Sequence, residues 1–158
     1  MKSAIIALGM LLLGTLAAKA ESPPEIPLPT LLVEHAWAKP NYGPNGAAYF
    51  IIRNHGKKTR HLTGAASPLS KRVELHTHKE EDGVMKMRKL KEPLTIAPGA
   101  SLKFAPAGHH VMLFAMETKL KEGESLPLTL HFKDGEKLTI TAKVKKQEQK
   151  KEHRGSHH

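Results

Sequence analysis

The stretch LPLTLHFKDGEKLTITAKV, residues 126–144, decides the fold class. Two runs of alternating apolar and polar residues, 126–132 and 137–144, flank the dipeptide Asp134-Gly135. Side chains two residues apart on a β-strand point to the same face, so each run offers one apolar face. An Asp-Gly pair between two such runs is a strong signal for a hairpin. This stretch therefore predicts two antiparallel strands joined by a turn.

Shorter runs of the same kind precede this hairpin. They are separated by turn residues about every 8 to 12 positions, a spacing typical of antiparallel sandwiches and barrels. No stretch between residues 31 and 144 keeps a sustained helical period. We therefore expect an all-β fold, an antiparallel sandwich or barrel. The expected strands are residues 31–38, 47–53, 71–78, 84–90, 94–96, 101–104, 111–116, 126–132 and 137–144.

The two ends of the chain differ in composition from the centre. Residues 1–20 combine an early lysine, an uncharged apolar run and a final A-x-A cleavage pattern, which is typical of a secretory signal peptide. We expect a proline-rich linker at 21–30, one domain at 31–144, and a basic, disordered tail at 145–158. No later run reaches the roughly 20 apolar residues of a membrane span. The mature protein should be a soluble periplasmic monomer without a transmembrane segment.

Composition excludes several classes of function. The chain has no cysteine, so we expect no lipid anchor, no disulfide, no thiolate nucleophile and no cysteine-ligated zinc or blue-copper site. The net charge is +10, but aromatic residues make up only 4%, and an exported protein of this kind is not expected to bind nucleic acid. Residues 143–158 hold six Lys or Arg against two Glu. Such a tail favours anionic lipid or an acidic partner.

Histidine and methionine cluster in the middle of the domain. The methionines that follow residue 20 are Met85, Met87, Met112 and Met116. We expect Met116 to fill the core, as methionine commonly does. If the hairpin over 73–90 turns between Glu81 and Asp82, His76 faces Met87 and His78 faces Met85. Opposed residues have Cβ atoms about 4.5 to 5.5 Å apart, which lets one ion bridge an imidazole and a thioether.

A second His-Met pair lies further along the chain, where His110 and Met112 share the strand face opposite Val111 and Leu113. If that strand lies beside the hairpin, two imidazoles and two thioethers converge. Thioether sulfur is a poor ligand for Mg²⁺, Ca²⁺ or Zn²⁺ and a good one for Cu(I). The predicted metal site is therefore His76, Met87, His110 and Met112 with Cu(I). Proton competition at the histidines should weaken binding mainly below about pH 6.

The segments VELHTHKEEDGVMKMRKL (73–90) and APAGHHVMLF (105–114) resemble the periplasmic copper chaperones called PCuAC. The signature of that family is His, ten residues, Met, about twenty-one residues, then His-x-Met. His76 and Met87 match it, and twenty-two residues separate Met87 from His110. His109 fits the spacing literally but lacks the His-x-Met form, so we choose His110. The likeness extends over roughly 33–144, including HAWAKP and GAAYFIIRNHG.

This resemblance implies a cupredoxin-like, Greek-key β-sandwich that binds Cu(I). It also implies delivery of the ion to the dinuclear copper centre of cytochrome c oxidase, in subunit II, alongside a Sco-type protein. Some relatives bind Cu(II) through His- or Met-rich tails, and His153, His157 and His158 could serve in that way here. His78 and Met85 lie outside the signature, and they would either support the ligands from behind or form an alternate His-Met pair.

Other functions stay open at this point. One is copper storage or tolerance, another a copper-dependent oxidase or a hydrolase that uses His35, His76 and His110, and a third a metal-independent binding module. Hydrolase sites combine histidine with carboxylate around an open metal position, and the sequence has no H-E-x-x-H or G-x-S-x-G motif. We therefore do not expect an enzyme. We expect Trp37 and Tyr49 in the core. The histidines expected at the surface or at strand ends are His35, His55, His61 and His131.

Overall fold

A computed structural model describes residues 29–147, and every regular element in that range is a β-strand. This confirms the expected all-β class. The strands are β1 (Leu31–Ala38), β2 (Gly46–Asn54), β3 (Arg60–Ala66), β4 (Arg72–Glu81), β5 (Val84–Lys89), β6 (Leu94–Ile96), β7 (Ser101–Lys103), β8 (His110–Phe114), β9 (Ser125–Phe132) and β10 (Lys137–Val144).

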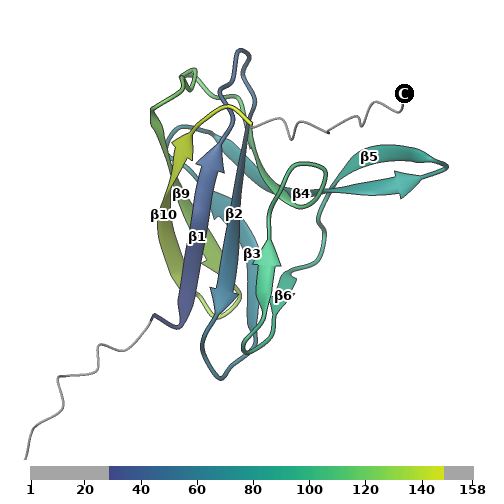
Figure 1. Ribbon diagram of the computed structural model, residues 1–158, viewed down its shortest axis with the longest axis vertical. Helices are drawn as coiled ribbons and strands as arrows, with labels where there is room; N and C mark the ends of the chain where they lie inside the picture. Colours follow the sequence, from purple (N-terminus) through teal and green to yellow (C-terminus); the bar gives the residue numbers. More distant parts are fainter. Residues whose placement is uncertain (1–28, 148–158) are drawn as a thin grey trace, which may run out of the picture.

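Hydrogen bonds join the strands in the order β5-β4-β8-β2-β1-β10-β9-β3-β6, and β7 pairs with β2. The sheet curls over itself, so that strands from its two halves face each other across one core (Figure 1). All strand pairs are antiparallel except β1 with β10, where Trp37 lies beside Lys143. A parallel pair needs a long connection, and here almost the whole domain lies between the two strands. The sandwich expected from the sequence therefore contains one parallel pair.

The core is built from the alternation that the sequence shows most clearly in β9. Leu126, Leu128 and Leu130 are fully buried there, and Phe132 is nearly so. The Asp134-Gly135 hairpin is confirmed: Lys137 of β10 pairs with His131 of β9, and Gly135 takes a positive φ of 87°. Glycine adopts that left-handed conformation without the steric cost of a Cβ atom.

The aromatic side chains divide between the core and its edge. Phe50 of β2 stacks on Phe104, with ring centroids 4.4 Å apart. Tyr49 is buried, as expected, whereas Trp37 is only half-buried and packs against Tyr49 at a centroid distance of 4.6 Å. Consecutive residues of one strand point to opposite faces. Tyr49 therefore lies on the outer face of the sheet, the same face as His110 of β8.

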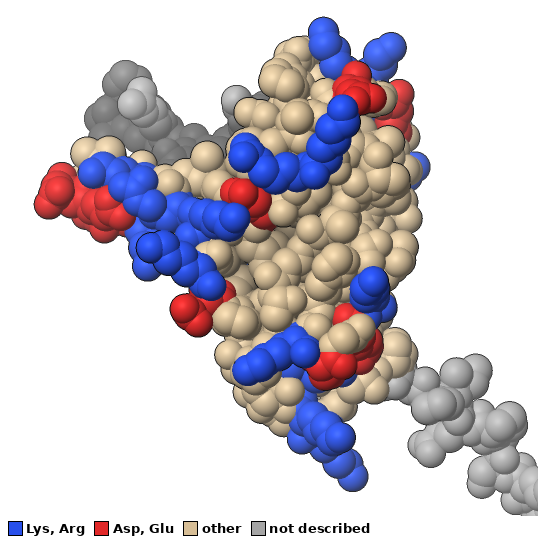
Figure 2. All heavy atoms as spheres, turned by 180° about the vertical axis from the view of Figure 1, so that it is seen from behind, with Lys and Arg blue, Asp and Glu red and all other residues tan. Residues whose placement is uncertain are grey.

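The hairpin of β4 and β5 projects from the sandwich body as an arm, which we define as residues 78–88 (Figure 1). Exposed apolar side chains lie on it, among them Met85 and Met87. Lys and Arg side chains also gather on the arm, with acidic groups at its tip (Figure 2). Some of these charges pair, since Glu81 accepts hydrogen bonds from Arg88 and lies 3.6 Å from the Lys86 ammonium. The arm is thus supported on its outer half mainly by its own ladder and ion pairs.

The register of the arm differs from the one expected. His76 pairs with Lys89, and His78 pairs with Met87, so His76 does not face Met87. Met85 is opposite Glu80 rather than His78. The reason is the turn: Asp82 and Gly83 have φ of 54° and 74°, and Asp-Gly is favoured where both central residues of a two-residue turn need positive φ. The turn is therefore centred one residue later than expected, which shifts the cross-strand partner of each β4 residue by two positions along β5.

Several expectations concern parts of the chain outside the described residues. These are the signal peptide at 1–20, most of the linker at 21–30, the tail from residue 148 and the histidines in it. Within residues 29–147, no helix is long and apolar enough to cross a membrane.

Candidate metal centre

Three neighbouring strands, β5, β4 and β8, bring the four expected ligands to one face of the sheet. His76 of β4 lies directly opposite His110 of β8, and Glu74 lies opposite Met112. Met87 is opposite His78, which makes it a diagonal neighbour of His76 on the other side. Diagonal neighbours are about 7 to 8 Å apart, within reach of long side chains. Methionine can therefore reach His76 from both flanking strands.

His110 lies at the centre of this arrangement and is 3% exposed. Its Nδ1 is 3.1 Å from the carbonyl oxygen of Gly108, and its Nε2 is 3.1 Å from Sδ of Met87. A carbonyl oxygen only accepts, so Nδ1–H is the donor in the neutral ring. The Nε2 lone pair then points at a thioether sulfur, itself an acceptor. Two lone pairs facing each other are best satisfied by an electrophile shared between them.

The Gly108 carbonyl is held in place by a short, tight loop between β7 and β8. Gly108 N–H donates to the Ala105 carbonyl at 3.0 Å, and Ala105 N–H donates to the His109 carbonyl at 2.9 Å. Ala107 has a φ of 65°, a left-handed conformation that costs a residue with a Cβ about 1 to 2 kcal/mol. The loop therefore holds a strained backbone in place beside the ring that it orients.

Burial lowers the pKa of His110, and the nearby His78 and His76 add to this effect. The hydrogen bond to the Gly108 carbonyl acts in the opposite direction. The net result is a neutral ring at neutral pH. Only the neutral form of histidine can bind a metal, so the surroundings of His110 favour its metal-binding state.

His76 has the partner arrangement of a metal-binding histidine. Its Nε2 lies 2.8 Å from a carboxylate oxygen of Glu74, and its Nδ1 is buried without a hydrogen-bond partner. Hydrogen bonds from His76 and then Lys89 lower the pKa of Glu74, which keeps that carboxylate ionised. A carboxylate that accepts the N–H of an imidazole fixes the tautomer and leaves the other nitrogen as a ligand. Nδ1 of His76 is thus a second available imidazole nitrogen.

The remaining expected ligand, Met112, is half-buried on β8 and lies between Glu74 of β4 and Ala47 of β2. It is therefore placed deeper in the sheet than Met87, which is 42% exposed. The structure thus gathers all four expected residues on one face. On that face Nε2 of His110 and Sδ of Met87 are at contact distance. Among the described residues, no hydrogen bond links Met112 to either histidine.

The comparisons with known proteins agree with this fold. A family model described as "Putative lipoprotein LpqE-like" matches residues 31–144. The chain belongs to the LpqE-like family. The Putative lipoprotein Lxx21020 of Leifsonia xyli subsp. xyli (strain CTCB07) is 31% identical over 113 residues, which cover 72% of this chain and 68% of the relative.

Solved structures relate this LpqE-like chain to PCuAC domains. The apo PCuAC domain from PmoF1 matches with a TM-score of 0.61 and 22% identity, covering 77% of this chain and 98% of that chain. The solution structure of Cu(I)-DR1885 from Deinococcus radiodurans matches with a TM-score of 0.56 and 32% identity, covering 76% and 79%. The resemblance seen in the sequence is confirmed.

The structure separates the two other histidines of the motif segments in this LpqE-like domain, His78 and His109. His78 shares the face of the four expected ligands, and its ring centroid is 5.1 Å from that of His110. The Asp-Gly turn was the signal for this proximity, because it fixes the register that places His78 opposite Met87. His109 precedes His110 and points to the other face, where its ring lies 5.9 Å from Phe104. His109 therefore does not belong to this cluster.

The alternative that combines His35 with His76 and His110 does not agree with the sheet order. His35 is exposed on β1, and β2 separates β1 from β8. Strands are about 4.8 Å apart, so His35 lies about 10 Å from the strand of His110. Within residues 29–147, no three His, Cys, Asp or Glu side chains are placed to hold one metal ion together. A site on this face therefore needs the methionines.

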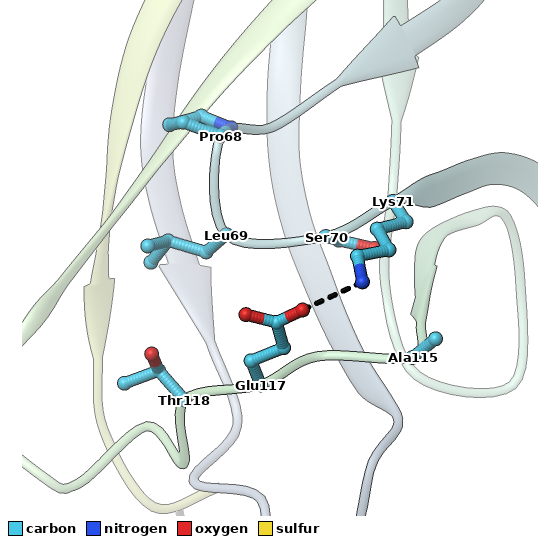
Figure 3. Close-up of a pocket in the computed structure, with 7 residues that line it drawn as sticks. All are labelled: Pro68, Leu69, Ser70, Lys71, Ala115, Glu117 and Thr118. Carbon is cyan, nitrogen blue, oxygen red and sulfur yellow. Dashed lines mark ion pairs between the residues drawn. The ribbon is translucent and has the colours of Figure 1, made fainter.

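A hollow elsewhere on the domain lacks these chemical features. It lies between the β3–β4 connection and the segment after β8, and an ion pair of 2.7 Å between Lys71 and Glu117 spans it (Figure 3). Its lining contains no histidine or methionine. The imidazole and thioether groups are instead concentrated on the face of β5, β4 and β8.

Proposed function

We propose that the protein is a Cu(I)-binding metallochaperone that holds the ion with His76, Met87, His110 and Met112 and delivers it by ligand exchange. The observation that carries this proposal is the approach of Nε2 of His110 to Sδ of Met87 at 3.1 Å. An imidazole nitrogen and a thioether sulfur suit a soft, monovalent cation such as Cu(I). The copper in the Cu(I)-DR1885 structure supports the choice of metal.

All four proposed ligands are neutral, which fits a carrier. A buried anionic ligand set would leave a net charge in a low-dielectric site, whereas four neutral ligands leave only the charge of the ion. Neutral ligands can also be displaced one at a time by an incoming donor. Met87 is the most accessible of the four, so an acceptor can replace it first. No covalent bond of a substrate is broken, and we propose no enzymatic activity.

We further propose that the acceptor is the dinuclear copper centre of cytochrome c oxidase subunit II, with a Sco-type protein taking part. A basic and aromatic surface beside the site would suit an acidic protein. Tyr49 lies 6.4 Å from His110 between ring centroids, and the Lys39 ammonium lies 5.6 Å above the Tyr49 ring. The Lys145 ammonium lies 5.7 Å from the centroid of Trp37, which packs on Tyr49. These two lysines therefore lie against the aromatic pair that neighbours His110.

The site of action that we propose is the periplasm, reached through cleavage of a signal peptide at residues 1–20, and the working form is a monomer. The relative from Leifsonia xyli is named a lipoprotein, which supports a location outside the cytoplasm. Expression of the full chain in a Gram-negative host, cell fractionation and mass spectrometry of the product test this proposal. We expect a periplasmic protein that begins at Glu21, and an uncleaved cytoplasmic product would contradict it.

Copper binding is tested by anaerobic competition titration with a colourimetric Cu(I) chelator. We expect one Cu(I) per chain, and we expect the same number in a version that ends at Val144. A second metal equivalent, taken up as Cu(II) and lost on truncation, would place a secondary site at His153, His157 and His158 of the tail.

The matched variants for this titration are His110→Ala and His109→Ala. The two histidines are neighbours in the sequence, His110 buried and His109 half-buried, and burial lowers the pKa of each. Only His110 lies on the proposed copper face. We expect His110→Ala to lose the copper and His109→Ala to keep it. Equal affinity in the two variants would overturn the proposed site.

A further inference from the structure

The face that carries the proposed copper ligands holds a third imidazole, His78. Its ring centroid is 5.1 Å from that of His110, whereas the ring of His76 is 5.9 Å from His110. His78 is also the direct cross-strand partner of Met87, and opposed residues are the closest pairs of a ladder. His78 is therefore at least as well placed as His76 to share an ion with Met87 and His110.

The ring of His78 is incompletely satisfied. Its Nδ1 is buried and has no hydrogen-bond partner, as is also true of Nδ1 of His76. A buried nitrogen without a partner costs free energy, which makes such atoms rare and often functional in native proteins. Two unpartnered imidazole nitrogens thus lie on one face, two residues apart on the same strand.

Accessibility decreases from the arm toward the body across this face. Met85 is 53% exposed and Met87 is 42% exposed, His78 is half-buried, and His76 and His110 are buried. A cation that arrives from solvent meets Met87 and His78 before it meets His76. The described residues hold no group of three His, Cys, Asp or Glu that could bind one ion jointly, so His78 and His76 would act in turn.

We propose that His78 is an exchange ligand, which holds Cu(I) with Met87 and His110 at the rim before the ion moves to His76 and Met112. This proposal rests on the proposed copper function. In the step, the Cu–N bond to His78 breaks as the Cu–N bond to His76 forms, and Met112 joins. Both imidazoles are neutral, so no electron or proton is transferred. Release to an acceptor follows the same steps in reverse.

An exchange ligand has a kinetic signature that a resting ligand lacks. Removing it raises the barrier for entry and for exit equally, because it is absent from the final bound state. Loading and release should slow by the same factor while the equilibrium affinity stays nearly constant. Loss of a resting ligand would instead lower the affinity itself.

The test compares His78→Phe with His109→Phe by stopped-flow transfer of Cu(I) to and from a chelator. His109 is the matched control, because its Nδ1 is also buried and unpartnered but lies on the other face. We expect His78→Phe to slow both directions about tenfold or more with an affinity within about threefold of wild type. We expect His109→Phe to leave both rates unchanged.

Transfer rates in His78→Phe that equal those of the wild type would overturn the proposal. An equal slowing of transfer in His109→Phe would overturn it as well. Failure of the wild-type chain to bind Cu(I) would instead remove the proposed function itself. Thermal unfolding of the metal-free variants checks the fold, and His78→Gln, which keeps a polar group, replaces His78→Phe if the latter unfolds. Slowed exchange in His78→Gln supports the proposal in the same way, and unaltered exchange contradicts it.

Discussion

The sandwich body and the arm are both built from antiparallel strand pairs, but different surroundings stabilise them. In the body, Leu126, Leu128 and Leu130 are fully buried between facing strands. On the arm, Val84 and Met85 are more than half exposed. Burial of apolar area dominates folding free energy, so the body contributes nearly all of the stability. Residues of the arm can therefore differ in chemistry with little effect on the stability of the fold.

The proposed copper site lies where these two regions meet. His76, His110 and Met112 belong to strands of the body, and Met87 belongs to the arm. Hydrogen bonds orient the two histidines: the Glu74 carboxylate holds His76, and the Gly108 carbonyl holds His110. The more accessible thioether comes from the less supported region. In the proposed function, this division would let one site be well ordered and still release its ion.

Stability should separate the two regions most strongly. We expect Leu128→Ala to lower the free energy of unfolding by about 2 to 5 kcal/mol, because it leaves a cavity in a packed core. Met85→Ala should change it by less than about 0.5 kcal/mol, as an exposed side chain has few contacts to lose. Denaturant unfolding of both variants measures the difference, and equal losses would contradict the division into body and arm.

The two proposed thioether ligands offer the next test. Met87→Leu and Met112→Leu keep a similar volume and remove only the sulfur, so the fold should persist. We expect each to weaken Cu(I) binding about 100-fold or more, which is about 2.7 kcal/mol by the relation of affinity to free energy. Chelator competition measures this, with Met116→Leu in the core as the control. Retained affinity in Met112→Leu would remove Met112 from the ligand set.

Replacing the Glu74 carboxylate, which is hydrogen-bonded to His76, should have a smaller effect on Cu(I) affinity. Glu74→Gln keeps an acceptor for Nε2–H of His76 but removes the negative charge that also pairs with Lys89. Loss of such an outer partner typically weakens metal binding about 10-fold to 100-fold, and we expect the lower end. The same titration gives the value. An unchanged affinity would show that the tautomer of His76 is fixed without the carboxylate charge.

Acidification should destabilise the metal-free protein before its carboxylates titrate. Burial lowers the pKa of His110 and of His109 below that of an unfolded histidine, which is about 6.5. The unfolded chain therefore takes up protons first, and stability falls as the pH drops from about 6.5 through the lowered values. Unfolding midpoints at a series of pH values test this. In His110→Phe the loss should be smaller, and a rise in stability on acidification would contradict the sign.

The smallest expected effect concerns the loop that orients His110. Ala107 adopts a φ of 65°, and replacing it with glycine should remove strain worth about 1 to 2 kcal/mol, partly offset by the greater freedom of glycine in the unfolded chain. We expect a net gain below about 1 kcal/mol in thermal or denaturant unfolding, with copper affinity unchanged. A clear loss of stability would show that the Cβ of Ala107 makes contacts that matter.

The sequence predicted the strand faces of the body better than the register of the region where the body meets the arm. Alternation in β9 and β10 fixes which side chains enter the core, because a one-residue shift would expose all of them. The register of the arm is set instead by its turn. A turn centred one residue earlier, as expected from the sequence, would pair His78 with Met85 instead of Met87. The facing of His110 and Met87 depends on the pairing of the β4–β5 hairpin with β8, a strand that is distant in sequence, and no local pattern encodes that pairing. The parallel β1–β10 pair was missed for the same reason.

X-ray absorption at the copper edge, on protein loaded anaerobically with one equivalent of Cu(I), tests the central claim most directly. We expect both nitrogen neighbours at about 2.0 Å and sulfur neighbours at about 2.3 Å, distances close to those of other first-row metal sites. The sulfur signal should fall in Met87→Leu and in Met112→Leu. A spectrum of wild-type protein with nitrogen and oxygen neighbours alone would contradict a site shared by imidazole and thioether groups.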